Sequence, residues 1–510
     1  MGLEDDRQSV SAPPAGFDLA RWIVPLAVVA VVALRLPYLN RPPTTDESGY
    51  LLIGAQWHAG GTSLYGDYWV DRPPGLLALF QLSSVLGGVP AVHVMGCVAV
   101  GLLVLGSSFA AGLIAGPRAA RWSAVVAAAL CTTPLLGTDA VNGEILASPF
   151  IVWSIVATLA AFRATDERRA VLFALAAGAG AMCGLLVKQN LADAFVFGLV
   201  ATIVAWRLGD ISGRRCFRIL VSAAGGAIVA LAAIATLTLM RGTSLPDAFN
   251  AMYTFRLEAG RVIAAGGSRG AALRLHGLLT VSVVSGLAFL VLMVIWGAVS
   301  RRLRGAAAIG LSATLLFDAL SIAMGGNYWS HYLVELFTPI AILTGVLISR
   351  HQPLLRPLVA ATVVVSAVAW TTSHANARPS GTAAVGYSIA ASAHRSDTIV
   401  IAYGHPEIVK NSGLSSPYPY LWTLPVKTLD PQLRALNTVL TGPKAPTWLV
   451  IWNNLQSWGL NVKTVSATVR RDYRFVGRLC GHRVYLHRGV TRAKLRAQSP
   501  CRLASTLSAP

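Results

Sequence analysis

The sequence predicts an α-helical polytopic membrane protein with about 11 transmembrane helices, additional interfacial helices and a small C-terminal α/β domain outside the cytoplasm. Three observations support this fold class. Of the 510 residues 54% are hydrophobic, only 13% are charged, and apolar runs long enough to span a bilayer recur along the chain. Soluble domains average about 25% charged residues. Disordered, collagen-like and disulfide-scaffold classes are excluded because aliphatic residues are abundant, glycine has no period and cysteines are few.

Eleven apolar runs are long enough to cross a membrane as helices. They lie at 19–36, 91–115, 121–138, 145–162, 170–187, 191–206, 218–240, 277–298, 305–325, 331–349 and 355–372. Arginine-rich loops follow every second run if a short apolar stretch at 74–90 is not counted. Since cytoplasmic loops carry an excess of Lys and Arg, these loops and the amino terminus are expected to be cytoplasmic. We therefore expect 74–90 to dip into the outer leaflet without crossing.

A change in composition after residue 372 separates two domains. Residues 1–372 form the predicted transmembrane domain, which begins with a retained helix because no small-residue cleavage site follows the first apolar run. Residues 373–510 carry 17 Lys and Arg against four Asp and Glu, with strand-like runs at 398–403, 448–452 and 483–487. We expect 373–490 to form the α/β domain and 491–510 a flexible basic tail.

The formal charge of +20 does not indicate nucleic-acid binding in this chain. Part of it marks the cytoplasmic loops, and most of it lies in the outside domain, where it faces anionic lipid headgroups or envelope polymers. Cys480 and Cys501 are the two cysteines in the oxidising compartment. Whether they form a disulfide stays open, because pairing cannot be deduced from sequence.

The first outside loop, 37–90, carries the most informative residues. Asp46 and Glu47 stand together just outside the first span, ahead of a segment, 48–58, with the apolar spacing of an interfacial helix. An acidic pair alone also fits a simpler role at the first turn of that helix. The loop continues as Tyr68-Trp69-Val70-Asp71-Arg72-Pro73-Pro74.

These residues together resemble the signature of family 39 membrane glycosyltransferases with the GT-C fold. That family includes the protein O-mannosyltransferases and the bacterial lipid A aminoarabinose transferases. The resemblance implies a polyprenyl monophosphate sugar as donor and reaction at the outer face of the membrane. It further implies that Asp46 is the general base or acceptor-binding carboxylate, with Glu47 as its supporting partner.

The chemistry of sugar transfer explains these residue types independently. An alcohol is a poor nucleophile, so a carboxylate such as Asp46 must take or orient its proton, and cations must stabilise the departing phosphate. Arg72 is one candidate cation. The family has Lys or His at this point, but arginine keeps the charge and adds a forked donor suited to phosphate. Lys188, at the outer end of a predicted span, is another candidate, and it also fits an anchor to lipid phosphate.

Other outside loops hold further candidates. Asp139 and Glu144 form a second acidic site that could orient the acceptor or hold a divalent cation, although helix capping by Asn142 explains this segment as well. His331 resembles a basic family position, which implies a phosphate contact. Its aromatic neighbours suit either sugar stacking or a membrane-interface belt. The candidate pocket residues are Tyr68, Trp69, Asp71 and Tyr328.

Two ionisable residues, Asp318 and Glu335, lie inside predicted spans. Such groups usually face a cavity or a partner, because an isolated charge in a span is costly. A different signal comes from the outside segment 247–261, where apolar residues recur near helical spacing. That spacing predicts a surface helix that covers the cavity as a lid.

The sequence therefore predicts an inverting hexosyl- or pentosyltransferase of the plasma membrane that moves a sugar from a polyprenyl phosphate to an envelope glycan, lipid or protein. Mannose and arabinofuranose carriers are two open donors, and the need for a divalent cation is open too. The alternative function is a transporter or lipid-linked-sugar flippase with an outside binding domain. It predicts charged residues along a through-path and often a repeated half, and the sequence shows neither pattern.

Overall fold

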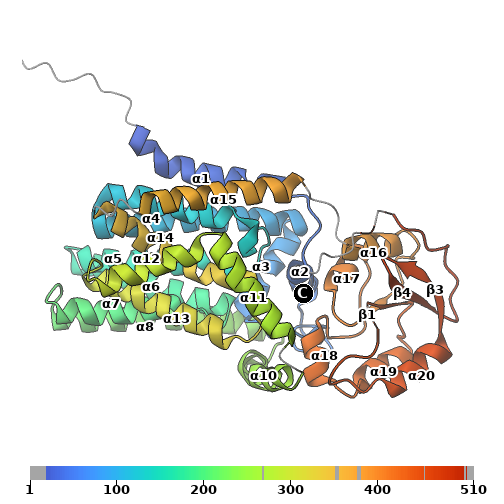
Figure 1. Ribbon diagram of the computed structural model, residues 1–510. Helices are drawn as coiled ribbons and strands as arrows, with labels where there is room; N and C mark the ends of the chain where they lie inside the picture. Colours follow the sequence, from blue (N-terminus) through green and yellow to red (C-terminus); the bar gives the residue numbers. More distant parts are fainter. Residues whose placement is uncertain are drawn as a thin grey trace, which may run out of the picture.

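The computed structural model describes residues 19–266, 269–350, 355–375, 381–452, 454–498 and 501. A long helical bundle makes up most of the chain, and a small domain with a β-sheet lies beyond one end of the bundle (Figure 1). The predicted polar start, 1–17, lies outside the described residues, as do 499–500 and 502–510 of the predicted tail.

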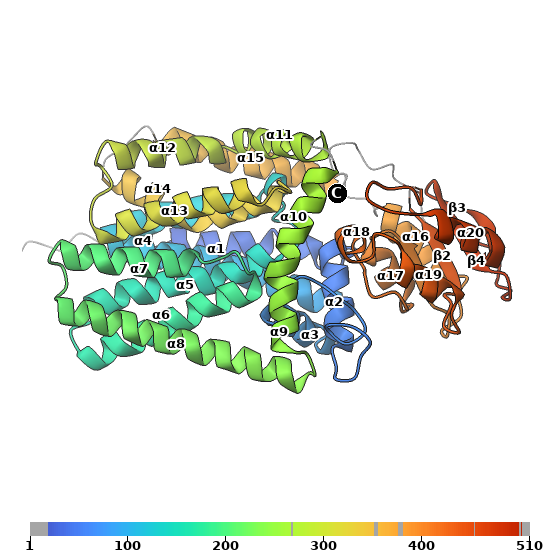
Figure 2. The same cartoon turned by 90° about the horizontal axis from the view of Figure 1, so that it is seen from below.

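Apolar helices that run side by side form the bundle (Figures 1 and 2). They are α1 (Ile23–Ala33), α4 (Val89–Thr132), α5 (Gly143–Arg163), α6 (Glu167–Val187), α7 (Asp193–Arg207), α8 (Gly213–Met240), α11 (Arg269–Val284), α12 (Leu287–Val299), α13 (Ala306–Met324), α14 (Phe337–Ser349) and α15 (Leu355–Ala375). Short 3-10 turns precede or follow several of them, including η3 (Pro134–Leu136) and η5 (Ser330–Leu336).

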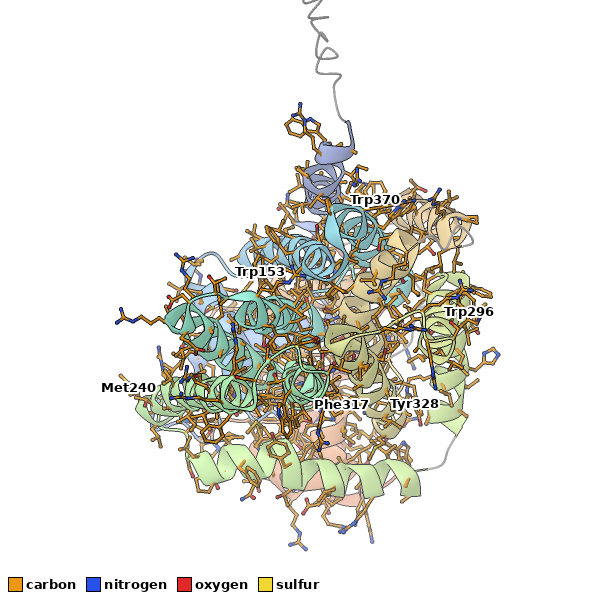
Figure 3. All side chains as sticks on the ribbon, turned by 90° about the vertical axis from the view of Figure 1, so that its left-hand side faces the viewer. Trp153, Met240, Trp296, Phe317, Tyr328 and Trp370 are labelled. Atoms are coloured by element: carbon orange, nitrogen blue, oxygen red, sulfur yellow. A yellow bond between two sulfur atoms is a disulfide. The ribbon has the colours of Figure 1, made fainter. Side chains whose placement is uncertain are left out.

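The outside of the bundle is apolar. Viewed along its length (Figure 3), Met240 and Trp296 lie at the edge, and they are 75% and 40% exposed. Within the described residues, eight helices are long and apolar enough to cross a membrane, or nine if the bent pair α11 and α12 is one span. A surface of this kind needs lipid around it, so the chain is a multi-pass membrane protein.

The eleven predicted spans all overlap helices, but two of them belong to α4. Its backbone leaves the helical range at Ala115 and Gly116, where the φ of Gly116 is 81°. Ser123 Oγ donates to Ser107 O at 3.0 Å, whereas residues this far apart in a straight helix would be separated by about 24 Å. The two arms of α4 are therefore antiparallel and correspond to the predicted spans 91–115 and 121–138.

The predicted span 277–298 is not one continuous helix. It is divided into α11 and α12, which meet at an angle of 74°. Gly286 stands at the break with a φ of 83°, and a Cβ there would come within 2.5 Å of Thr362 Oγ1. The break thus depends on a residue without a side chain. The predicted span 191–206 corresponds to α7, whose 15 residues are too few to count among the eight.

Two short helices of the first loop lie at the bundle end that faces the small domain, α2 (Thr45–Gln56) and α3 (Pro74–Val85) (Figure 2). With 12 residues, α3 is about 18 Å long and cannot cross a hydrocarbon core of about 30 Å. This agrees with the prediction that the segment 74–90 does not cross the membrane. Between the bundle and the small domain, α9 (Leu245–Phe249), η4 (Asn250–Thr254) and α10 (Phe255–Ala265) form one crosswise helix (Figure 2), as the spacing in 247–261 predicted.

The small domain holds a four-stranded sheet in the order β1-β2-β4-β3. Only β1 and β2 are parallel, and all their residues are buried, as in strands covered on both faces. A disulfide joins Cys480 to Cys501. The elements are α16 (Gly381–Ala390), β1 (Ile399–Ala402), α17 (Pro406–Ser412), α18 (Thr423–Leu429), α19 (Arg434–Thr441), β2 (Trp448–Ile451), α20 (Lys463–Asp472), β3 (Tyr473–Leu479) and β4 (His482–His487).

The placement of α3 leads to a topology test. Leu86, at the end of α3, is 68% exposed, so we expect Leu86→Cys to react with a membrane-impermeant maleimide in intact cells. Arg169→Cys, an exposed position in the first turn of α6, should react only after permeabilisation. The four native free cysteines are buried or half-buried, and the unmodified protein measures their background. Labelling of Leu86→Cys only in permeabilised cells would contradict the predicted topology.

Candidate active site

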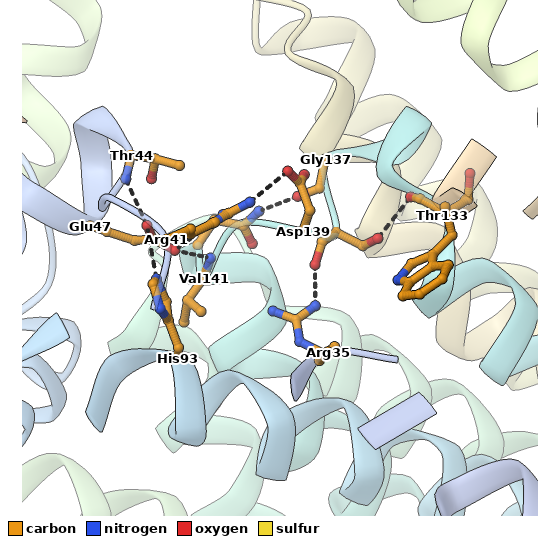
Figure 4. Close-up of polar contacts among 12 residues, drawn as sticks. Arg35, Arg41, Thr44, Glu47, His93, Thr133, Gly137, Asp139 and Val141 are labelled. Atoms are coloured by element: carbon orange, nitrogen blue, oxygen red, sulfur yellow. Dashed lines mark hydrogen bonds and ion pairs between the residues drawn. The ribbon is translucent and has the colours of Figure 1, made fainter. Parts of the chain in front are cut away.

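The first turn of α2 is fixed by Glu47, which is fully buried. Thr44 caps the helix, and its backbone N–H donates to Glu47 Oε2 at 2.7 Å. The other oxygen, Oε1, accepts a hydrogen bond from Val141 N at 2.6 Å. Arg41 Nη2 lies 3.8 Å from Oε1, and His93 Nε2 lies 3.5 Å from Oε2. Glu47 therefore ties the start of α2 to α4 and to the segment before α5 (Figure 4).

These contacts keep Glu47 ionised. Burial by itself would raise the pKa of Glu47, but the neighbouring His93 and the charge of Arg41 outweigh it and lower the pKa to about 2. Asp139 joins the same network, because Arg41 Nη1 lies 2.7 Å from Asp139 Oδ2 (Figure 4). Asn142 caps α5, accepting from Ile145 N at 3.0 Å, which agrees with the simpler interpretation of this segment.

Asp46 is half-buried and touches the small domain. Its Oδ1 accepts a hydrogen bond from the indole Nε1 of Trp422 at 3.1 Å. Trp422 immediately precedes α18, so the contact joins the first loop to a residue 376 positions later. The predicted catalytic carboxylate therefore lies where the end of the bundle meets the small domain.

Arg72, in the turn before α3, is joined to α2 through Tyr50, one helical turn after Asp46. Its Nε donates to Tyr50 OH at 2.9 Å and its Nη1 to Asp71 Oδ1 at 2.8 Å. Arg256 of α10 forms an ion pair with the other Asp71 oxygen, with 2.8 Å between Arg256 Nε and Asp71 Oδ2. Burial opposes the charge of Arg72, but Asp71 raises the pKa of the guanidinium, and Asp46 is near enough to add to this effect. Among the described residues, Arg72 Nη2 has no hydrogen-bond partner.

Lys188 stands at the end of α6 and is only 9% exposed. Its Nζ contacts Glu144 Oε1, lies 3.1 Å from Glu335 Oε1 and sits 4.5 Å from the centre of the Tyr332 ring. Asn190 Nδ2 donates to the same Glu335 oxygen at 3.0 Å. An anchor to lipid phosphate would be exposed at the membrane surface, so the burial of Lys188 contradicts the anchor interpretation.

His331 connects the surroundings of Lys188 with those of Asp46. Its Nε2 lies 3.7 Å from Glu144 Oε1, and its ring is within electrostatic reach of Asp46 and Arg72. We refer to the whole group as the polar cluster. Its members are Asp46, Asp71, Arg72, Glu144, Lys188, Arg256, His331, Tyr332 and Glu335.

Asp193 and Asp318 are buried close to Glu335. Glu335 has the partner expected for an ionisable group in a span, Lys188, whereas neither side-chain oxygen of Asp318 has a hydrogen-bond partner among the described residues. Within the described residues, no group of three or more His, Cys, Asp or Glu side chains is arranged to hold a metal ion.

Two of the predicted pocket residues hold other elements in place. Tyr68 is buried, and its OH accepts from Ser416 N at 3.0 Å. Trp69 N donates to Pro419 O at 3.1 Å, and the Trp69 ring centre lies 4.6 Å from that of Phe255 in α10. Tyr68 and Trp69 therefore fasten the small domain and the crosswise helix to the first loop.

The structure places Tyr332, and not Tyr328, in the polar cluster. Tyr328 follows helix α13, and its OH donates to Ala323 O near the end of that helix at 3.1 Å. The 3-10 turn η5 carries Tyr332 over Lys188. Sequence reasoning also did not single out Arg256 or Trp422, because an arginine in a surface helix and a tryptophan in a loop carry no distinguishing local pattern.

Solved structures share this fold, although no family model and no curated protein matches the sequence. ArnT from Cupriavidus metallidurans bound to undecaprenyl phosphate is 15% identical, with a TM-score of 0.66 over 91% of this chain and 98% of that chain. The apo state of the same ArnT is 14% identical, with a TM-score of 0.63 over 91% of this chain and 97% of that chain. The archaeal oligosaccharyltransferase AglB from Archaeoglobus fulgidus, in complex with an inhibitory peptide and a dolichol-phosphate, is 12% identical, with a TM-score of 0.51 over 94% and 75%. The chain therefore has the GT-C fold.

The buried Glu47 predicts an acid-sensitive stability. Its pKa of about 2 lies below the ordinary 4.5, so its stabilisation is complete above about pH 4.5 and is lost as the pH falls toward 2. We expect Glu47→Gln to lower the free energy of unfolding at pH 7 by about 3 kcal/mol and to flatten its dependence on pH in this window. Unfolding in detergent between pH 3 and 7 measures this. Asp210→Asn, at an exposed position, is the control, and identical slopes for Glu47→Gln and the unmodified protein would contradict the expectation.

Lys188 is the only cation that directly contacts both Glu144 and Glu335 among the described residues. Lys188→Met leaves two buried carboxylates without this partner, so we expect the free energy of unfolding to fall by roughly 3–5 kcal/mol. Adding Glu144→Gln should restore part of the loss, because one of the carboxylates is then neutral. Arg169→Met is the control at an exposed site. If Lys188→Met unfolds like this control, the ion pair does not stabilise the fold.

Proposed function

We propose that this protein is a membrane glycosyltransferase that moves a sugar from a polyprenyl-monophosphate carrier to an envelope glycan, lipid or protein at the outer face of the plasma membrane. The observation that carries the proposal is the half-buried carboxylate of Asp46, one helical turn from Tyr50, whose OH binds the guanidinium of Arg72. Among the described residues, Nη2 of this guanidinium has no hydrogen-bond partner. Asp46 and Arg72 lie where the bundle end and the small domain meet.

The pair supplies both requirements of the reaction. Asp46 takes or orients the proton of the acceptor hydroxyl as its oxygen attacks the anomeric carbon of the sugar. The bond between that carbon and the phosphate oxygen breaks, and the electrons go to the phosphate. Arg72 Nη2 and the terminal nitrogens of Arg256 stabilise the charge that develops there. A single displacement of this kind inverts the configuration at the anomeric carbon.

We assign the phosphate to the two arginines first, and to Lys188 and His331 second. Lys188 already contacts two carboxylates and an aromatic face, whereas Arg72 and Arg256 each share only one carboxylate, that of Asp71. The lipid phosphates bound by ArnT and AglB support a lipid-phosphate donor.

The arrangement of charges supports the outer face as the place of reaction. The loops that join α5 to α6, α7 to α8 and α12 to α13 lie at the bundle end away from the small domain (Figure 2), and these segments carry the arginine clusters. By the positive-inside rule those loops are cytoplasmic. The polar cluster and the small domain then face outward.

Transfer assays with the purified protein test the proposal. We expect Asp46→Asn and Arg72→Gln each to lower kcat about 100- to 10,000-fold, the range usual for loss of an acid–base or charge-stabilising group. Labelled polyprenyl-phosphate mannose and arabinofuranose serve as donors, with envelope extract as acceptor. Asp210→Asn, exposed at the opposite end of the bundle, is the control.

Two outcomes would contradict the assignment. Full transfer by both Asp46→Asn and Arg72→Gln would remove the carboxylate and the guanidinium from the mechanism. Movement of the lipid-linked sugar across reconstituted vesicles without transfer would instead favour the flippase alternative.

A further inference from the structure

The small domain supplies a side chain to the predicted catalytic carboxylate. Trp422 donates its indole N–H to Asp46 Oδ1 at 3.1 Å, and this is the only hydrogen bond that Asp46 side-chain oxygens accept among the described residues. The second oxygen, Oδ2, is left open. The contact is therefore selective for one oxygen of the carboxylate.

Helix α2 leaves space for the Trp422 indole next to Asp46. Gly49, one turn after Asp46 in α2, faces the Trp422 ring, and a Cβ at Gly49 would lie 2.2 Å from Cζ2 and 2.3 Å from Cη2 of that ring. Tyr50 packs on it as well, with 5.5 Å between the ring centres. Any side chain at position 49 would displace the indole from its present position.

The segment that leads to Trp422 is held in place by three residues before the contact. Ser416 N and Pro419 O bond to Tyr68 and Trp69 of the first loop. Leu421, directly before Trp422, is 4% exposed and belongs to the apolar core of the bundle. The indole is therefore presented to Asp46 by a fixed segment that is anchored to the membrane domain.

We propose that Trp422 is a positioning residue for Asp46: it occupies Oδ1 and holds the carboxylate so that Oδ2 meets the acceptor hydroxyl. The proposal rests on the proposed function, since it takes Asp46 to be the acceptor-side carboxylate. A base that is oriented by a third group is the usual arrangement when a hydroxyl is activated. Here the orienting group comes from the small domain, and the base comes from the membrane domain.

Replacing the indole with an aromatic ring that lacks an N–H group tests this role. Trp422→Phe keeps an aromatic ring beside Gly49 and Tyr50 but removes the N–H. We expect kcat to fall about 10- to 100-fold with the KM values for donor and acceptor within about twofold, because orientation of the base is lost while the binding surfaces remain. Trp458→Phe, in the same domain, is the matched control. An unchanged kcat overturns the proposal. A lower acceptor KM with higher kcat overturns it as well, because the indole would then occupy the position of the acceptor.

A double-mutant cycle separates positioning from loss of folding. Gly49→Ala displaces the indole, so we expect it to lower kcat about as much as Trp422→Phe. In a Trp422→Ala background the same alanine meets no ring, and we expect no further loss. Gly277→Ala, where a Cβ meets nothing within 4 Å, controls for the glycine change itself. Equal losses from Gly49→Ala in both backgrounds would show that Gly49 and Trp422 act independently and would overturn the proposal.

Failure of this inference is distinguishable from failure of the proposed function. Asp46→Asn is measured beside Trp422→Phe, with donor binding as a separate readout. If Asp46→Asn abolishes transfer and Trp422→Phe does not change it, only the positioning role is wrong. If Asp46→Asn transfers sugar normally, the catalytic assignment itself is wrong.

Discussion

One buried carboxylate organises the amino-terminal half of the site. Glu47 has no exposed surface and is paired on every side, by two backbone N–H groups, by Arg41 and by His93. An ionised carboxylate without such partners costs several kcal/mol to bury. Helix α2 can therefore begin only where the first loop, α4 and the segment before α5 converge. Asp46 is the residue before Glu47, so its position follows from this single constraint.

The cations of the site divide into two kinds. Lys188 is surrounded by Glu144, Glu335 and the Tyr332 ring, and it joins α5, α6 and η5 within the bundle. Arg72 and Arg256 share one carboxylate, that of Asp71, and within the described part of the chain each keeps terminal nitrogens without a hydrogen-bond partner. The first arrangement is saturated and favours rigidity. The second leaves donor capacity at the surface of the cluster, which is what recognition of a phosphate requires.

Much of the fold could be predicted from patterns in the amino-acid sequence. The lengths of apolar runs predicted where the helices lie, because these lengths depend on the bilayer and not on neighbouring segments. Strand β3 was not predicted, because a bulge near Gly477 interrupts its pairing with β4 and the alternation of its inward and outward side chains. Within the site, Asp46 and Arg72 belong to a contiguous motif that sequence reasoning can find. Trp422 and Arg256 reach the cluster only through packing of distant segments, so no local pattern marks them.

The hydrogen bond between Asp46 and Trp422 also bears on how the protein is made. A ribosome that adds 5–20 residues per second takes roughly 20 to 75 s to pass from one of these codons to the other. During that time the membrane helices insert while the carboxylate still lacks the indole. A copy that stalls or is cleaved before the last domain folds would thus enter the membrane unfinished. The Asp46 carboxylate of such an incomplete chain lacks the single hydrogen-bond donor that it has among the described residues.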